Sequence, residues 1–189
     1  NVTSQSPSWP AAGTNTLADQ LKIVSRLIGG GSQTKIYLVT LSGFDTHSGQ
    51  TDTSNTTTGT HANLLSKLSG AISAFMDDLN YLGVSDRVIG MTFSEFGRRI
   101  ISNASTGTDH GSGEPMLLFG NKVQPGILGT NPVIPANATA NDNVAMQYDF
   151  RSVYSSILNE WFCVPQTDLN QIMLQNFQLL PLVDASACA

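Results

Sequence analysis

Residues 35–47 read KIYLVTLSGFDTH and combine the two signals on which the fold prediction rests. Residues 36–41 form a nearly continuous apolar run with β-branched members, which is typical of a strand buried on both faces. The run then gives way to a glycine and to polar residues that include a carboxylate and an imidazole. Ligands collect at the carboxyl ends of strands in open parallel sheets. We therefore expect a buried strand that leads directly into a functional loop.

Amphipathic helices are predicted on both sides of this stretch. Residues 17–28 place leucine, valine and isoleucine at spacings of four, three and four, which is one face of a helix. Three consecutive glycines at 29–31 are expected to end it. Residues 61–82 carry large apolar side chains at helical spacing and give the clearest periodic signal in the chain. Gly83 is expected to end this second helix.

Two further strands are predicted at residues 87–93 and 115–119. Strand, helix and strand in succession form a βαβ unit, whose crossover makes the two strands parallel. The predicted fold class is therefore α/β, with a mainly parallel sheet that has helices on both faces. In this arrangement the helix over 61–82 crosses between strands 36–41 and 87–93.

The two ends of the chain have different signals. Asp149 is a typical N-cap residue for a helix over 150–162, and a short helix is expected near 168–176. Residues 1–16 are polar, contain two prolines and indicate a loose arm. A length of 189 residues fits one domain, so residues 1–189 are assigned to a single α/β domain.

Composition and charge argue against two classes of partner. Nine basic residues stand against fourteen acidic ones, the formal net charge is −5, and no basic cluster occurs. Nucleic-acid binding requires several cations on one face, so it is not expected. No apolar run approaches the roughly 20 residues of a membrane-spanning helix, so no transmembrane segment is expected either.

The two cysteines, Cys163 and Cys188, both lie near the C-terminus. A pair confined to this region suits a disulfide in an oxidising compartment, with two buried free thiols as the alternative. The spacing does not match a CxxC zinc motif. A periplasmic or secreted location is therefore expected.

Three polar clusters adjoin the predicted strands and supply the candidate site. They are GFDTH at 43–47, SEFGR at 94–98 and GTDHG at 107–111. Carboxylate and imidazole are the ligands of hydrolytic zinc and manganese sites. The planar guanidinium of Arg98 suits an anionic oxygen. The candidate metal ligands are Asp45, His47, Glu95, Asp109 and His110.

Structural roles remain open for the same residues. An Asp-His pair on a loop also occurs in turns that the aspartate side chain stabilises. Glu95 can cap the following turn or pair with Arg98. His61 begins the long helix, where a role in a polar cap is preferred over metal binding. Phe44 and Phe96 are most simply assigned to the core or to a pocket wall.

The order of these motifs resembles one protein family. GFDTH, an H-x-x-LL helix start, a strand into SEFGRR, and GTDHG before a strand resemble the proteins of unknown function numbered 1501, DUF1501, from about Leu21 to Phe162. This family is placed in the alkaline-phosphatase and sulfatase superfamily. The resemblance implies an alkaline-phosphatase-like fold of which this chain is the C-terminal portion. It also implies an exported protein whose N-terminal half precedes Asn1.

The resemblance implies roles for individual residues. Asp45 and His47 are expected to bind a first metal, which His110 completes, while Asp109 adds a carboxylate. Glu95 stands with Phe96 where the superfamily usually has Asp-His for a second metal, and a phenylalanine cannot be a ligand. The expected cofactor is a divalent metal, zinc first, with manganese or calcium as alternatives. The nucleophilic serine or threonine and a further metal-binding aspartate are expected in the N-terminal half, so the resemblance implies that the site is incomplete in residues 1–189 alone.

Two functions follow from the resemblance. The first is metal-dependent hydrolysis of an anionic phosphate or sulfate ester, with Arg98 as the catalytic residue that binds the ester oxyanion. The alternative is a non-catalytic exported protein for surface assembly or glycan binding on the same fold, and the Glu95-Phe96 departure favours it. A serine hydrolase is not expected, because no G-x-S-x-G motif occurs.

Overall fold

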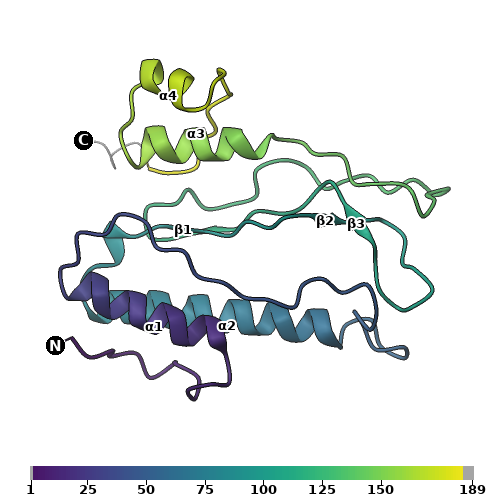
Figure 1. Ribbon diagram of the computed structural model, residues 1–189, viewed down its shortest axis with the longest axis horizontal. Coiled ribbons are helices and arrows are strands. Elements are labelled where there is room, and N and C mark those ends of the chain that lie inside the picture. Colours follow the sequence, from purple (N-terminus) through teal and green to yellow (C-terminus); the bar gives the residue numbers. More distant parts are fainter. Residues whose placement is uncertain (1, 185–189) are drawn as a thin grey trace.

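The computed structural model describes residues 2–184 and shows a mostly helical chain (Figure 1). Strands and long loops run between one helix pair, α1 and α2, and a second pair, α3 and α4. The elements in chain order are α1 Thr16–Gly29, α2 Thr60–Tyr81, the 3-10 helix η1 Ser85–Arg87, β1 Gly90–Met91, β2 Gly97–Arg98, β3 His110–Gly111, β4 Leu118–Phe119, α3 Phe150–Glu160 and α4 Gln166–Ile172.

The helix predictions for the N-terminal half are confirmed. Asn15 caps α1, because its side chain accepts a hydrogen bond from the backbone N–H of Ala18. The helix ends at Gly29, within the predicted glycine run. After α2, Gly83 adopts φ +67°, a conformation that glycine reaches without strain.

The main hydrophobic core lies between α1 and α2. Full burial of a leucine or phenylalanine contributes about 1.5–3 kcal/mol relative to exposure, so this stripe stabilises the pairing of the two helices. Its buried members are Leu17, Ala18, Leu21, Val24, Ile28, Ala71, Phe75 and Leu79.

The prediction of a parallel sheet is wrong. The described residues contain two sheets of two strands each, and both are antiparallel. β1 pairs with β4, so only two residues of each predicted strand, 87–93 and 115–119, are in a ladder. The α/β class with helices on both faces of a parallel sheet is therefore replaced by a mostly helical arrangement, and α2 is not a crossover between parallel strands.

Residues 36–41 explain the error. They run along the helix pair as an extended segment, in which Tyr37, Val39 and Leu41 pack against the core. Ile36 and Leu38 alternate with them and are 74% and 72% exposed. Within residues 2–184 no other segment forms a ladder with this run. The apolar run predicted burial on both faces, whereas the tertiary structure covers only one.

The N-terminal arm is tied to the helix pair by the carboxylate of Asp78, which is fully buried in α2. Its Oδ1 accepts hydrogen bonds from the backbone N–H groups of Gln5 and Ser6, and its Oδ2 accepts from the Ser25 hydroxyl at 2.6 Å. Burial opposes ionisation, but these donors outweigh it and hold the pKa of Asp78 below its usual value. One carboxylate thus connects the arm, α1 and α2.

The C-terminal helices form a second, smaller packing unit. Asp149 caps α3 as predicted, because its side chain accepts from the Arg151 N–H at 2.9 Å. α3 ends at Glu160, two residues before the predicted end, and α4 begins two residues before the predicted start. The hydroxyl of Ser156 accepts from the Leu180 N–H at 2.7 Å and so attaches the chain after α4 to α3.

Cys188 lies outside the described residues, so the disulfide between Cys163 and Cys188 stays a prediction. We expect thiol titration of the unfolded, unreduced protein to find no reactive thiol. On the chain-entropy model, closing this loop stabilises the fold by about 3 kcal/mol. Titration after reduction is the control and should find two thiols; two thiols before reduction would exclude the bond.

Candidate metal centre

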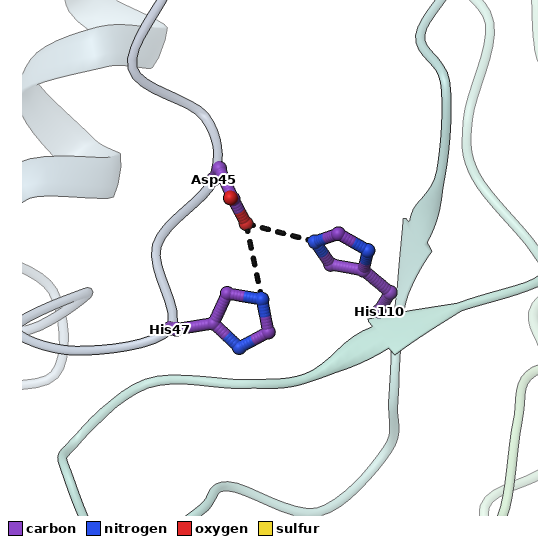
Figure 2. A group of neighbouring side chains, drawn as sticks. All are labelled: Asp45, His47 and His110. Carbon is purple, nitrogen blue, oxygen red and sulfur yellow. Dashed lines mark hydrogen bonds and ion pairs between the residues drawn. The ribbon is translucent and has the colours of Figure 1, made fainter.

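The side chains of Asp45, His47 and His110 converge at one exposed position (Figure 2). Asp45 Oδ1 lies 2.8 Å from His110 Nε2 and 3.2 Å from His47 Nε2. Asp45 and His47 come from the loop after the extended segment, whereas His110 belongs to β3. Figure 2 shows both imidazoles turned toward the same carboxylate oxygen. Three residues from distant parts of the chain therefore offer ligand atoms to one point.

Backbone pairing brings the two histidine-bearing loops together. The N–H groups of Gly49 and Gln50 donate to the carbonyls of Ser105 and Thr106, each at 3.0 Å. Gly107 sits against His47 so closely that a Cβ atom there would lie 2.3 Å from the His47 carbonyl carbon. A side chain at position 107 would push the two loops apart, so the first glycine of GTDHG is required for steric reasons. The clusters at 43–47 and 107–111 meet through loop contacts and not at a sheet edge.

Arg98 lies beside the centre and bonds mainly to backbone. In β2 it is the register partner of His110. Its guanidinium donates to the carbonyls of Thr108, at 2.7 Å, and Phe44, and it lies 3.4 Å from Asp45 Oδ1. These contacts connect the loops that carry the candidate ligands.

Phe96 supports the centre from the side. Its ring stacks on the His110 imidazole with a centroid distance of 3.5 Å and an interplanar angle of 11°. The guanidinium carbon of Arg98 lies 4.9 Å from the centroid of the Phe96 ring. The stack limits the orientation of the His110 ring. Sequence reasoning assigned Phe96 to a core or pocket wall, and its contact with a candidate ligand is seen only in the tertiary structure.

Asp109 and Glu95 stand apart from the three converging side chains. Asp109 Oδ1 lies 3.1 Å from His47 Nδ1, on the side of the imidazole away from Asp45. Glu95 is exposed. Among the described residues, it does not belong to the group of three side chains that could hold a metal. Asn103, which the sequence did not single out, donates from Nδ2 to Asp109 Oδ1 at 3.1 Å.

The local electrostatics keep both aspartates ionised. The hydrogen bond with His110 outweighs a smaller desolvation effect and, with the nearby His47 and Arg98, holds the pKa of Asp45 below its usual value. Hydrogen bonds from Asn103 and His47 lower the pKa of Asp109 in the same way. At a pH above the ordinary pKa of an aspartate, the ionised forms of Asp45 and Asp109 therefore stabilise the folded state. This stabilisation is lost as the pH falls through the lowered pKa values of the two groups.

The three ligand atoms, which all lie within 4.8 Å of one another, could hold a metal ion. Zinc binds imidazole nitrogen and carboxylate oxygen at about 2.0–2.2 Å, so two ligands on a tetrahedron lie about 3.3 Å apart. The distances from Asp45 Oδ1 to the two Nε2 atoms, 2.8 and 3.2 Å, approach this edge length. The three side chains are 46–59% exposed, which leaves a face open. Three protein ligands with an open position are typical of catalytic zinc sites, whereas structural sites are closed by four.

The fold and the centre define a mostly helical chain with an exposed His-His-Asp cluster. Comparison with protein families matches residues 11–167 to the model described as a protein of unknown function, DUF1501. The chain belongs to this family, as its motifs had indicated. Neither the curated proteins nor the solved structures gave a match. In the described residues, no helix is both long and apolar enough to span a membrane.

Proposed function

We propose that this chain binds a divalent metal, zinc first, through Asp45 Oδ1, His47 Nε2 and His110 Nε2. The observation that carries the proposal is the approach of both imidazole nitrogens to one carboxylate oxygen. A carboxylate only accepts hydrogen bonds, so two imidazole nitrogens can both bond to Asp45 only if both carry a proton. A metal needs no proton on either nitrogen and can be bound by all three atoms. Two imidazoles favour zinc over manganese, and they argue against calcium, which takes six to eight oxygen ligands.

We further propose that the metal centre serves the hydrolysis of an anionic phosphate or sulfate ester. A zinc ion at such a site acts as a Lewis acid toward the ester oxygen and lowers the pKa of bound water. The chain contributes the open face of the three ligands. Arg98 holds the Asp45 loop and Phe96 holds the His110 ring, so both ligands are positioned before the metal binds. The expected cysteine pair supports a periplasmic or secreted location for this activity.

One observation favours a non-catalytic alternative, such as surface assembly or glycan binding. Arg98 was expected to bind the ester oxyanion, but both terminal nitrogens of its guanidinium bond to backbone carbonyls of the protein. Its side chain is only 20% exposed. An ester oxygen would have to displace these contacts, so the arginine fits a positioning role better than substrate binding.

Zinc content and ester hydrolysis test the two parts of the proposal separately. After zinc loading and dialysis, we expect elemental analysis to find one zinc per chain. Hydrolysis of p-nitrophenyl phosphate or p-nitrophenyl sulfate should depend on that zinc and be lost on chelation. Zinc binding without hydrolysis would favour the non-catalytic alternative, and no zinc binding would contradict the metal centre itself.

We expect zinc affinity to fall as the pH is lowered from 7.5 to 5.5. Each of the two histidines must be neutral to bind metal, so protons compete with zinc for both imidazoles. The pKa values of Asp45 and Asp109 are already lowered, so both carboxylates stay ionised over this range. Calorimetric titration with zinc at several pH values checks the profile. Constant affinity down to pH 5.5 would argue against two histidine ligands.

A further inference from the structure

We propose that Asp109 and Asn103 form an orienting pair that sets the tautomer of His47 and so directs Nε2 to the metal. This inference rests on the proposed metal centre and assigns Asp109 a positioning role in place of direct metal binding. A neutral imidazole carries one proton, on either Nδ1 or Nε2. If Nε2 binds the metal, the proton is on Nδ1 and needs an acceptor there.

The contacts of His47 place such an acceptor at the required atom. Its Nδ1 faces Asp109 Oδ1 at 3.1 Å, while its Nε2 faces Asp45. Asp45 Oδ1 also has His110 Nε2 and the Arg98 guanidinium as neighbours. A proton on Nδ1 therefore gives Asp109 its hydrogen bond and leaves the Nε2 lone pair on the side of the other two ligand atoms. Outer partners of this kind typically change metal affinity by about 10–100-fold.

Asn103 fixes Asp109 because its own amide can take only one orientation. Its Oδ1 accepts hydrogen bonds from the backbone N–H groups of Ser105, at 2.9 Å, and Gly107, at 3.2 Å. The amide nitrogen Nδ2 must therefore be the atom on the opposite side. It donates to Asp109 Oδ1 at 3.1 Å and to the His47 carbonyl at 2.8 Å. One asparagine thus closes its own turn and connects the acceptor to the backbone of the histidine that it orients.

Two substitutions separate orientation from folding. Asp109→Ala removes the acceptor for Nδ1–H. Asn103→Asp keeps an oxygen for the Ser105 and Gly107 N–H groups but places a second oxygen opposite the Asp109 carboxylate, so it preserves the turn and opposes the pair. Asp77→Asn, which removes a carboxylate charge from α2 at a residue that bonds to Ser8, is the matched control.

The experiment combines calorimetry with zinc and nitrogen-15 NMR of the histidine rings in the metal-free protein above pH 8. We expect zinc affinity to fall about 10–100-fold in Asp109→Ala and Asn103→Asp and to stay unchanged in Asp77→Asn. The wild-type His47 ring should show the Nδ1–H tautomer, and Asp109→Ala should shift it toward the Nε2–H form that a free histidine side chain prefers. A purely structural role would not change the tautomer.

The two readouts distinguish this inference from the proposed function. An unchanged His47 tautomer in Asp109→Ala, or a wild-type ring in the Nε2–H form, would overturn the orienting pair. Failure of the wild-type protein to bind zinc would overturn the metal centre, while the tautomer measurement would still decide the role of Asp109 and Asn103.

Discussion

Replacing His110 with alanine is expected to weaken zinc binding by more than about 100-fold, beyond the range that loss of an outer partner produces. His110 Nε2 makes the shorter of the two imidazole contacts to Asp45, at 2.8 Å. Its ring stacks on Phe96, which keeps Nε2 directed toward Asp45. Alanine leaves two protein ligands, fewer than the three of an open zinc site. Calorimetric titration with zinc measures the loss, and His47→Ala should behave similarly.

The third histidine provides the matched control. His61 lies at the start of α2, its ring is nearly perpendicular to that of Phe44 at a centroid distance of 6.0 Å, and it is not part of the converging group. We expect His61→Ala to bind zinc within about threefold of wild type, since every ligand remains. Equal losses in His61→Ala and His110→Ala would mean that zinc binds elsewhere or that the substitutions disturb the fold. If His110→Ala binds as tightly as wild type, the proposed centre is wrong.

Replacing Asp78 with alanine is expected to lower the free energy of unfolding by about 4 kcal/mol. The substitution leaves the N–H groups of Gln5 and Ser6 without their acceptor, and each unsatisfied donor costs about 1–3 kcal/mol. The Ser25 hydroxyl loses its 2.6 Å hydrogen bond to Asp78 and keeps only the contact with the Lys22 carbonyl at 3.1 Å. The side chain is fully buried, so water does not replace the lost oxygens. Urea denaturation followed by circular dichroism measures the change.

Asp77→Ala is the control for Asp78→Ala. Asp77 is the adjacent residue of α2, and its carboxylate accepts an exposed hydrogen bond from Ser8 at 2.9 Å. Its loss should change stability by less than about 1 kcal/mol. The pH dependence gives a second check: because the pKa of Asp78 is lowered in the fold, wild type should lose this stabilisation as the pH falls below about 4, whereas Asp78→Ala should not. Similar losses in both variants would argue against the buried carboxylate as the anchor.

Local signals in the sequence predicted the helices well. The apolar spacing over 17–28 and 61–82 led to α1 and α2 with ends within one residue, because a stripe at helical period can be buried only on one side of a helix. Asp149 was recognised as an N-cap for the same reason of local chemistry, since its partner, Arg151 N–H, lies two residues away. These features depend on residues close in sequence.

The strands show where local signals fail. A run such as 36–41 predicts an apolar extended segment, but a sheet also needs a second segment in register, and no single run specifies its partner. In the structure Val88 and Phe119 pack over the same helical core as Tyr37 and Val39, yet the ladder forms between β1 and β4. The partner, the antiparallel direction and the exposed face of 36–41 are properties of the whole arrangement.

The candidate metal centre also combines features that could be predicted from the sequence with features that depend on the fold. Residue order was enough to show that carboxylate and imidazole are concentrated at 45–47 and 109–110 and to indicate the DUF1501 family. The folded chain was needed to show that Asp45, His47 and His110 converge, that Asp109 lies on the far side of His47, and that Arg98 bonds to the loop backbone. The reason is physical: residue type fixes which atoms can bind a metal, whereas their separation depends on contacts between loops more than 50 residues apart in sequence.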